Sequence, residues 1–213
     1  NELTDAFLVA FRIPNFFRRL FAEGAFSQAF LPILADTKAN HSEEEVQQII
    51  NHIATKLLSI LMIITLIAVI TAPLIIFLFA WGFYFKSDAT QFQLASSMLR
   101  ITFPYLLLIS LTALSGSILN TYDNFTVPAF TPVLLNISLI LSAIFLSEYL
   151  STPIMALAWG VLIGGIAQLA FQIPFLRKIK RLPKLKFGHH QALITLKKRM
   201  LPALFGVSVS QIN

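Results

Sequence analysis

Five ionisable residues interrupt the first apolar segment of the chain, residues 4–35. Three are basic and two are acidic: Arg12, Arg18, Arg19, Asp5 and Glu23. An ionisable side chain inside a membrane helix costs roughly 2.5–3.5 kcal/mol, so such residues survive where they face a bundle interior or a wet cavity. The planar guanidinium group matches the oxygens of a phosphate. With one cationic group in excess, the segment suits an anionic, phosphate-bearing substrate.

The spacing of these charges supports one shared face. At about 100° per residue, an α-helix brings four of them within about 40° of each other: Asp5, Arg12, Arg19 and Glu23. Arg19 and Glu23 are also spaced for an i, i+4 pair. The alternative is that Arg18 and Arg19 extend to the membrane interface. The span would then end near Phe17, and residues 21–35 would be an interfacial helix.

Composition identifies the class of protein. Hydrophobic residues make up 56% of the 213 residues and charged residues 12%, against roughly 25% charged residues in a soluble domain. Four later stretches of 22 to 29 residues carry no charge at all. A helix needs about 20 apolar residues to cross a bilayer. We therefore predict an all-α, polytopic bundle of transmembrane helices.

The segments are assigned from their apolar runs and helix signals. The expected spans are residues 4–35, 43–81, 89–120, 128–147 and 153–179, followed by a basic loop over 182–199 and the start of another helix over 200–213. The chain ends look like cuts, so we expect a fragment of a longer protein.

Three local signals refine these spans. Ser42 and Glu45 form a capping box at the start of a helix. Pro104 lies inside the third span and should kink it. Gly160 and Gly164 form a GxxxG pair, which allows close approach of a neighbouring helix.

Charge distribution orients the chain. Nine Lys and Arg lie within residues 177–199, and residues 149–213 contain no acid. Because this cluster directly follows a membrane span, the positive-inside rule places it in the cytoplasm. We expect membrane lipids as partners there, with the loop in reach of anionic headgroups, and nucleic acid is disfavoured. The alternation of spans then puts residues 36–55 and 121–127 on the same side.

The chain shows no catalytic pattern. It has no cysteine, its four histidines lack metal-ligand spacing, and it contains no Gly-rich phosphate loop or nucleophile elbow. The residues therefore do not argue for an enzyme, and we expect no metal and no cofactor in this segment.

Several motifs resemble one family. They are TDAF at 4–7, PN at 14–15, RR at 18–19, FAEGAFSQAF at 21–30, RITFPY at 100–105, PAF at 128–130, LLN at 134–136, PA at 202–203 and GVSVSQ at 206–211. These stretches closely resemble the MurJ (MviN) family of lipid II flippases, over essentially the whole chain, and the run from Phe21 to Phe30 is the most specific.

The resemblance implies a fold and an activity. Residues 1–181 would form most of one lobe of a two-lobed, MATE-like exporter of the MOP superfamily, without its first helix and second lobe. The family moves lipid II, the undecaprenyl-pyrophosphate-linked peptidoglycan precursor, from the cytoplasmic to the periplasmic leaflet of the bacterial inner membrane by alternating access. Sodium or membrane-potential coupling is expected elsewhere in the full protein.

The resemblance also selects residues. Arg18 matches a cavity arginine of the family and Asp5 a cavity-side acid, whereas the helical wheel favours Arg19 over Arg18. The candidate substrate-binding residues are Arg18, Asp5, Arg19, Glu23, Arg12 and Asn15. The candidate hinges are Pro14, Gly24 and Pro104.

Two other functions stay open. The first is another MOP-superfamily exporter, which would carry polysaccharide-linked lipids or drugs. The second is a scaffold that recruits cell-wall synthesis proteins through residues 177–199.

Overall fold

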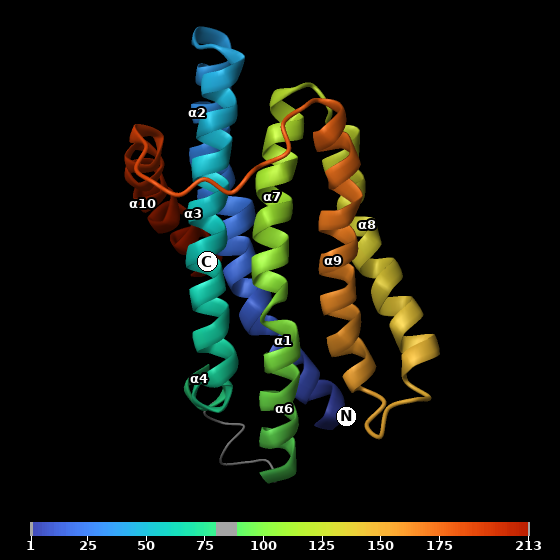
Figure 1. Ribbon diagram of the computed structural model, residues 1–213. Helices are drawn as coiled ribbons and strands as arrows, with labels where there is room; N and C mark the ends of the chain where they lie inside the picture. Colours follow the sequence, from blue (N-terminus) through green and yellow to red (C-terminus); the bar gives the residue numbers. More distant parts are fainter. Residues whose placement is uncertain (1, 80–88, 213) are drawn as a thin grey trace. The chain divides into compact units, whose positions relative to one another are not determined.

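A computed structural model describes the backbone of residues 2–79 and 89–212, and the side chains of these residues except 2–3, 21–23, 89 and 207–212. All the regular elements of this described part are helices (Figure 1), which confirms the all-α prediction. The chain divides into two compact units. The first contains Asn1–Phe16, Leu61–Leu108 and Pro132–Gln168, and the second contains Phe17–Ile60, Ile109–Thr131 and Leu169–Asn213.

The first segment is one helical path of changing geometry. Helix α1 covers Glu2–Phe17, the π-helix η1 covers Arg18–Phe26, and α2 covers Ser27–Asn40. We expected a polar break after residue 35. The helix instead continues, because Thr37 Oγ1 donates to the Ile33 carbonyl at 2.7 Å and Asn40 Nδ2 donates to Asp36 Oδ1 at 2.9 Å. These bonds hold the polar side chains within the helix.

The predicted capping box is confirmed. The Ser42 amide donates to Glu45 Oε2 at 3.1 Å, and the Glu45 amide donates to Ser42 Oγ at 3.3 Å. Helix α3 follows over Glu43–Ile70. Since both side chains satisfy backbone donors that a helix start leaves free, the start of α3 is fixed locally.

The expected helix over 43–81 is interrupted at Thr71, where α3 ends and α4, Ala72–Phe79, begins. Pro73 explains the break, because it has no N–H to donate to the carbonyl of Val69 four residues earlier. Arg100 Nε donates to that carbonyl at 3.3 Å. The arginine therefore supplies a hydrogen bond that the proline cannot make. Residues 80 and 81 lie outside the described residues.

The predicted kink at Pro104 is confirmed. Helix α6 ends at Thr102 and α7 begins at Tyr105, so that a turn separates Ala89–Thr102 from Tyr105–Thr121. Thr102 Oγ1 donates across to the Ala10 carbonyl at 3.4 Å, which ties the end of α6 to α1.

Helices α8 and α9 pack closely through glycine. Helix α8 covers Thr126–Leu141 and continues as the π-helix η2, Ser142–Leu146, and α9 covers Met155–Lys178. A Cβ on Gly164 would lie 2.8 Å from Leu135 Cδ1, and one on Gly160 would lie 3.0 Å from Ser142 Cβ. The predicted close approach is confirmed.

Four described helical segments are long and apolar enough to cross a membrane: Glu43–Ile70, Thr90–Thr121, Thr126–Leu146 and Met155–Lys178. The protein is therefore a multi-pass membrane protein. The charged segment α1–η1–α2 does not meet these criteria. A fifth crossing by this segment stays a prediction.

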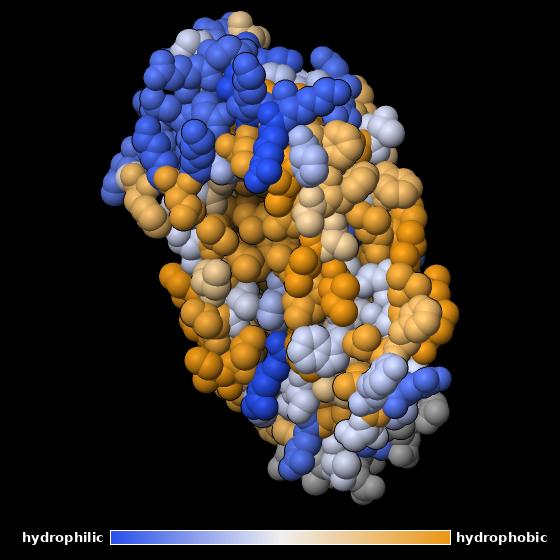
Figure 2. Space-filling model, turned by 45° about the vertical axis from the view of Figure 1, so that its right-hand side comes forward, coloured by the Kyte–Doolittle hydropathy of each residue, from blue (hydrophilic) through white to orange (hydrophobic). Residues whose placement is uncertain are grey.

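The spans differ in what they face. An apolar stretch of 18 residues within Thr90–Thr121 is 67% buried by the rest of the protein. The corresponding stretch within Thr126–Leu146 is only 17% buried. Large apolar side chains such as Ile140 and Phe145 are exposed on α8 and η2. Figure 2 shows extensive apolar areas at the surface beside a dense hydrophilic patch. The apolar areas are suited to contact with lipid.

The last helix begins earlier than expected. Helix α10 covers Gln191–Ile212, so it takes in half of the basic loop predicted over 182–199. Ala192 and Leu196, spaced i, i+4, are both 8% exposed. Their burial on one face stabilises a helix where charge alone suggested a loop.

Candidate functional site

Helix α1 presents its predicted site residues opposite a packed apolar face. Ala6 and Ala10 are fully buried, whereas Asp5 and Arg12 are exposed and Asn15 is half-buried. Asp5 and Arg12 are seven residues apart, which places them on the same side of the helix. The charges of α1 therefore point away from the helices that hold it.

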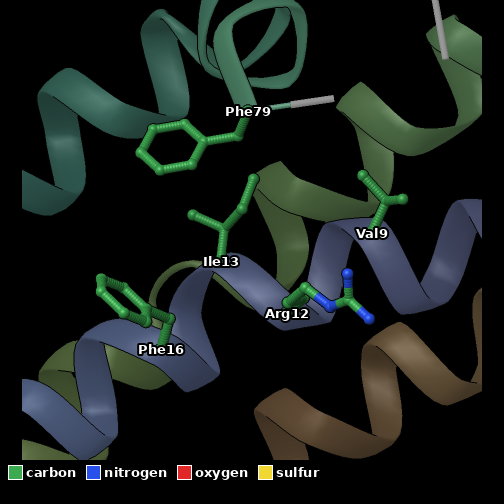
Figure 3. A pocket seen from close by; sticks show the side chains of 5 residues that line it. All are labelled: Val9, Arg12, Ile13, Phe16 and Phe79. Atoms are coloured by element: carbon green, nitrogen blue, oxygen red, sulfur yellow. The ribbon is translucent and has the colours of Figure 1, made fainter. Parts of the chain in front are cut away.

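Arg12 lines a pocket of about 260 Å³ in the first unit. The other lining residues are apolar: Val9, Ile13, Phe16 and Phe79. Figure 3 shows the Arg12 guanidinium extending toward the side of Val9, away from Ile13 and from the rings of Phe16 and Phe79. An apolar slot with one cation fits an amphiphile whose polar end is anionic.

Arg18 and Arg19 begin the π-helix η1 in the second unit. Arg18 is half-buried and Arg19 is exposed. Because a π-helix aligns positions i and i+5, the predicted i, i+4 pairing of Arg19 with Glu23 does not have α-helical geometry here. The Glu23 side chain lies outside the described residues. The wheel that preferred Arg19 to Arg18 also assumed an α-helix, so it does not apply to this segment.

The three candidate hinges differ in their surroundings. Pro14 is buried within α1, and Gly24 is buried within η1, both on an uninterrupted helical path. Pro104 lies at the turn between α6 and α7. Their role in motion stays a prediction.

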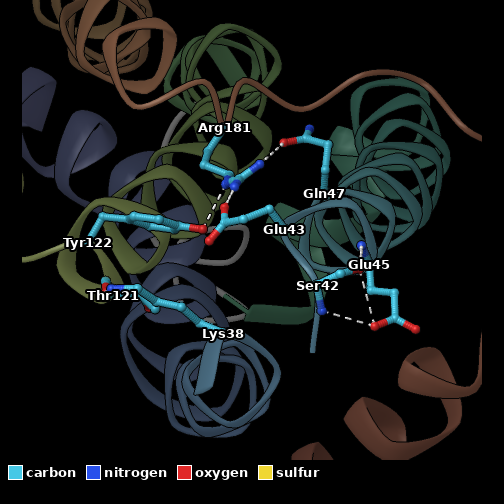
Figure 4. Close-up of polar contacts among 8 residues, drawn as sticks. All are labelled: Lys38, Ser42, Glu43, Glu45, Gln47, Thr121, Tyr122 and Arg181. Atoms are coloured by element: carbon cyan, nitrogen blue, oxygen red, sulfur yellow. Dashed lines mark hydrogen bonds and ion pairs between the residues drawn. The ribbon is translucent and has the colours of Figure 1, made fainter. Parts of the chain in front are cut away.

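A cluster that the sequence did not suggest surrounds Arg181, two residues beyond the end predicted for the last span (Figure 4). Arg181 Nε donates to the Tyr122 hydroxyl at 2.7 Å, and Nη1 lies 3.5 Å from Gln47 Oε1. Arg181 also forms an ion pair with Glu43. We call these four residues the Arg181 cluster. Burial lowers the pKa of Arg181 and raises the pKa of Tyr122.

Lys38 extends the contacts of this cluster. Its Nζ donates to the Thr121 carbonyl at 2.7 Å, at the end of α7, and lies 4.5 Å from the centre of the Tyr122 ring. Lys38 thus satisfies a carbonyl at a helix C-terminus, where a cation is favourable.

These contacts bring four helix ends together in the second unit. They join the end of α2, the start of α3, the end of α7 and the segment after α9. The alternation of spans predicted that residues 36–55, 121–127 and 177–199 share one side of the membrane, and the contacts agree. The sequence held only a weak signal for the cluster, since Gln47 is one of many polar residues in the first half of α3.

The chain is similar in sequence to known proteins. The sequence profile described as "Lipid II flippase MurJ" matches residues 1–213. The lipid II flippase MurJ of Burkholderia cenocepacia is 42% identical over 100% of this chain and 42% of its own length. The probable lipid II flippase MurJ of Haemophilus influenzae is 45% identical over 98% of this chain and 42% of its own length.

A solved structure is also similar. It is described as "Lipid II flippase MurJ, inward closed conformation", and it matches with a TM-score of 0.79 and 30% identity over 100% of this chain and 42% of that chain. The present chain therefore spans less than half the length of the relatives it matches.

Proposed function

Because the chain belongs to the MurJ family of lipid II flippases, we propose that it forms part of a transporter that moves lipid II across the bacterial inner membrane. Transport would run from the cytoplasmic to the periplasmic leaflet, with residues 177–199 in the cytoplasm. The four apolar spans and the dense positive charge of that segment support this placement.

The observation that carries the proposal is the series of arginines on the helical path from α1 into η1. Arg12 and Arg19 are exposed and Arg18 is half-buried. Guanidinium groups make charge-assisted hydrogen bonds that a pyrophosphate needs once it leaves the headgroup region. Arg18 is the principal ligand in this proposal, with Arg19 as its neighbour in the same unit, and Arg12 is a separate candidate in the first unit.

The acidic and amide residues of the same path have supporting roles in the proposal. Asp5, on the same side of α1 as Arg12, would limit the excess positive charge, and Glu23 would do so near Arg18. Asn15, half-buried, would donate a neutral hydrogen bond. The apolar pocket beside Arg12 suits the part of a lipid nearest its anionic head.

Alternating access would use bends at Pro14, Gly24 and Pro104. Pro104 has the clearest support, since the helix is already broken there. The break favours bending at this point, because Pro104 has no N–H to donate to the carbonyl four residues earlier. Sodium or the membrane potential would drive the cycle, which is tested by collapsing each gradient with an ionophore.

Substitution of Arg18 tests the assignment. We expect Arg18→Ala in the full-length protein to abolish translocation of lipid II in proteoliposomes. Arg18→Lys keeps the charge but loses the paired donors, so we expect partial activity. Arg199→Ala removes an exposed arginine from α10 and serves as the matched control, with activity retained. Wild-type translocation by Arg18→Ala would refute the role of Arg18 as a ligand.

A further inference from the structure

An extended segment, residues 179–190, joins α9 to α10, and we call it the strap. Three polar residues of α3 bind its backbone at every second position. Gln47 Nε2 donates to the Leu182 carbonyl at 3.1 Å, the Lys184 amide donates to Asn51 Oδ1 at 2.8 Å, and the Lys186 amide donates to Thr55 Oγ1 at 2.7 Å.

The match between strap and helix has a simple geometric cause. Gln47, Asn51 and Thr55 are four residues apart, which is a rise of about 6 Å on an α-helix. Two residues of extended chain rise about 6.6 Å. The two repeats are nearly equal, so the three successive hydrogen bonds can form along one face of α3. It therefore advances along α3 toward the apolar part of that helix.

The register places the end of the strap at the edge of the membrane. Lys56 is the last charged residue of α3, and the chain then carries no charge until Lys86. The Lys186 amide binds Thr55, immediately before this uncharged run. Residues 184–187 thus lie where the polar part of α3 meets its apolar part.

The side chains of this stretch combine charge with apolar surface. Leu185 is 68% exposed and Phe187 is 76% exposed. Lys184 and Lys186 are exposed as well. Side chains alternate along an extended chain, so the two apolar residues share one side and the two lysines the other. The strap contains no acidic residue.

We propose that residues 184–187 bind anionic phospholipids of the leaflet at this end of the spans. The two lysines contact lipid phosphates, and Leu185 and Phe187 enter the boundary between headgroups and acyl chains. Cations next to apolar residues at this depth are complementary to an anionic interface. A water-exposed loop has no comparable reason to present a leucine and a phenylalanine together. The proposal does not depend on the identity of the transported substrate.

Fluorescence quenching tests the depth of the strap. In a background in which every native tryptophan of the full-length protein, Trp81 and Trp159 included, is replaced by phenylalanine, the Phe187→Trp variant is placed in nanodiscs of phosphatidylcholine and phosphatidylglycerol with brominated acyl chains. We expect at least twofold quenching relative to unbrominated lipid. Glu44→Trp is the control, because Glu44 is exposed and lies about 16 Å from Thr55 along α3, away from the apolar run. Equally weak quenching of both variants would overturn the proposal. The same result is expected if protein, and not lipid, covers the side chain at position 187, and it would overturn the proposal in that case too.

Lipid retention tests the lysines. We expect Lys184→Gln/Lys186→Gln to retain at most half as much phosphatidylglycerol as the unsubstituted protein, measured by native mass spectrometry after mild detergent extraction. Lys197→Gln/Lys198→Gln changes the net charge equally on the exposed side of α10 and should retain the unsubstituted amount. An equal loss from both double variants would mean that net charge alone holds the lipid, and the assignment to the strap would fail.

Discussion

Arg181 Nε donates a hydrogen bond to the Tyr122 hydroxyl at 2.7 Å, across 59 residues of sequence. The Arg181 side chain is only 11% exposed, whereas Glu43, its ion-pair partner, is 67% exposed. The two contacts therefore differ in how much they contribute to the stability of the fold. The partly buried hydrogen bond is shielded from water on the Arg181 side, whereas the carboxylate of Glu43 is largely solvated in either case.

We expect Tyr122→Phe to destabilise the protein more than Glu43→Gln. A hydrogen bond from a charged donor contributes about 1.5–3 kcal/mol, while an ion pair with a solvated partner contributes about 0.2–1 kcal/mol. The measurement is the free energy of unfolding, or the apparent melting temperature, of the full-length protein in detergent. Glu44→Gln is the control, because Glu44 is exposed. A larger loss for Glu43→Gln than for Tyr122→Phe would contradict this ranking.

Thr55→Val should release the end of the strap. The hydroxyl of Thr55 accepts from the Lys186 amide at 2.7 Å and donates to the Asn51 carbonyl at 2.7 Å. Valine keeps the shape and leaves the Lys186 amide without this acceptor. We expect a loss of about 1 kcal/mol and faster hydrogen exchange at Lys186.

Thr71→Val is the matched control for this substitution. Its hydroxyl also donates to the carbonyl four residues earlier, that of Ile67, at 2.7 Å, but it lies at the other end of α3. Exchange at Lys186 should not change in this variant. Unchanged exchange in Thr55→Val as well would show that the strap is held without this bond.

Gly160→Val should separate α8 from α9. A Cβ at Gly160 would lie 3.0 Å from Ser142 Cβ and 3.3 Å from Leu139 Cα, so part of the clash is with the backbone. We expect a loss of about 1–3 kcal/mol, as for other overpacked sites, visible as a lower melting temperature. Gly206→Val is the control, because a Cβ at Gly206 would meet nothing within 4 Å. Equal effects at both positions would indicate a helix-propensity effect and not a packing one.

Features set by local rules were predictable from the sequence. The capping box of Ser42 and Glu45 and the kink at Pro104 each depend on residues within one turn of helix. The break at Thr71 follows the same rule, since Pro73 lies inside the span predicted over 43–81, and the prediction overlooked it. The GxxxG pair in α9 indicated a close contact without identifying the partner helix.

Features set by distant contacts were not predictable. The Lys184 amide meets Asn51 across 133 residues, and only the folded chain brings Arg181 to Glu43 and Tyr122. The π-helix at Arg18 has no local sequence signal, yet it changes which side chains align. This is why a wheel with a fixed angle could not rank Arg18 against Arg19.

The start of α10 should become less stable in acid, because the side chain of His190, the last residue of the strap, caps that helix. His190 Nδ1 accepts from the Ala192 amide at 3.2 Å, and its ring centre lies 5.1 Å from that of His52. Burial lowers the pKa of His190, and electrostatic interactions with His52 and Lys186 lower it further, against an opposing effect of Glu45. Protonation of Nδ1 also removes the acceptor.

The sign of the pH dependence follows from this shift. Since the folded pKa lies below the ordinary value of 6.5, the stabilisation is complete above about pH 6.5 and is lost as the pH falls through the folded pKa. We expect exchange of the Ala192 amide, corrected for its intrinsic rate, to accelerate over that range. His190→Asn keeps a capping acceptor that does not titrate, so its exchange should not depend on pH in this way. His189→Asn, at an exposed neighbour, should behave like the unsubstituted protein. The same acid response in His190→Asn would assign the titration to a group other than His190.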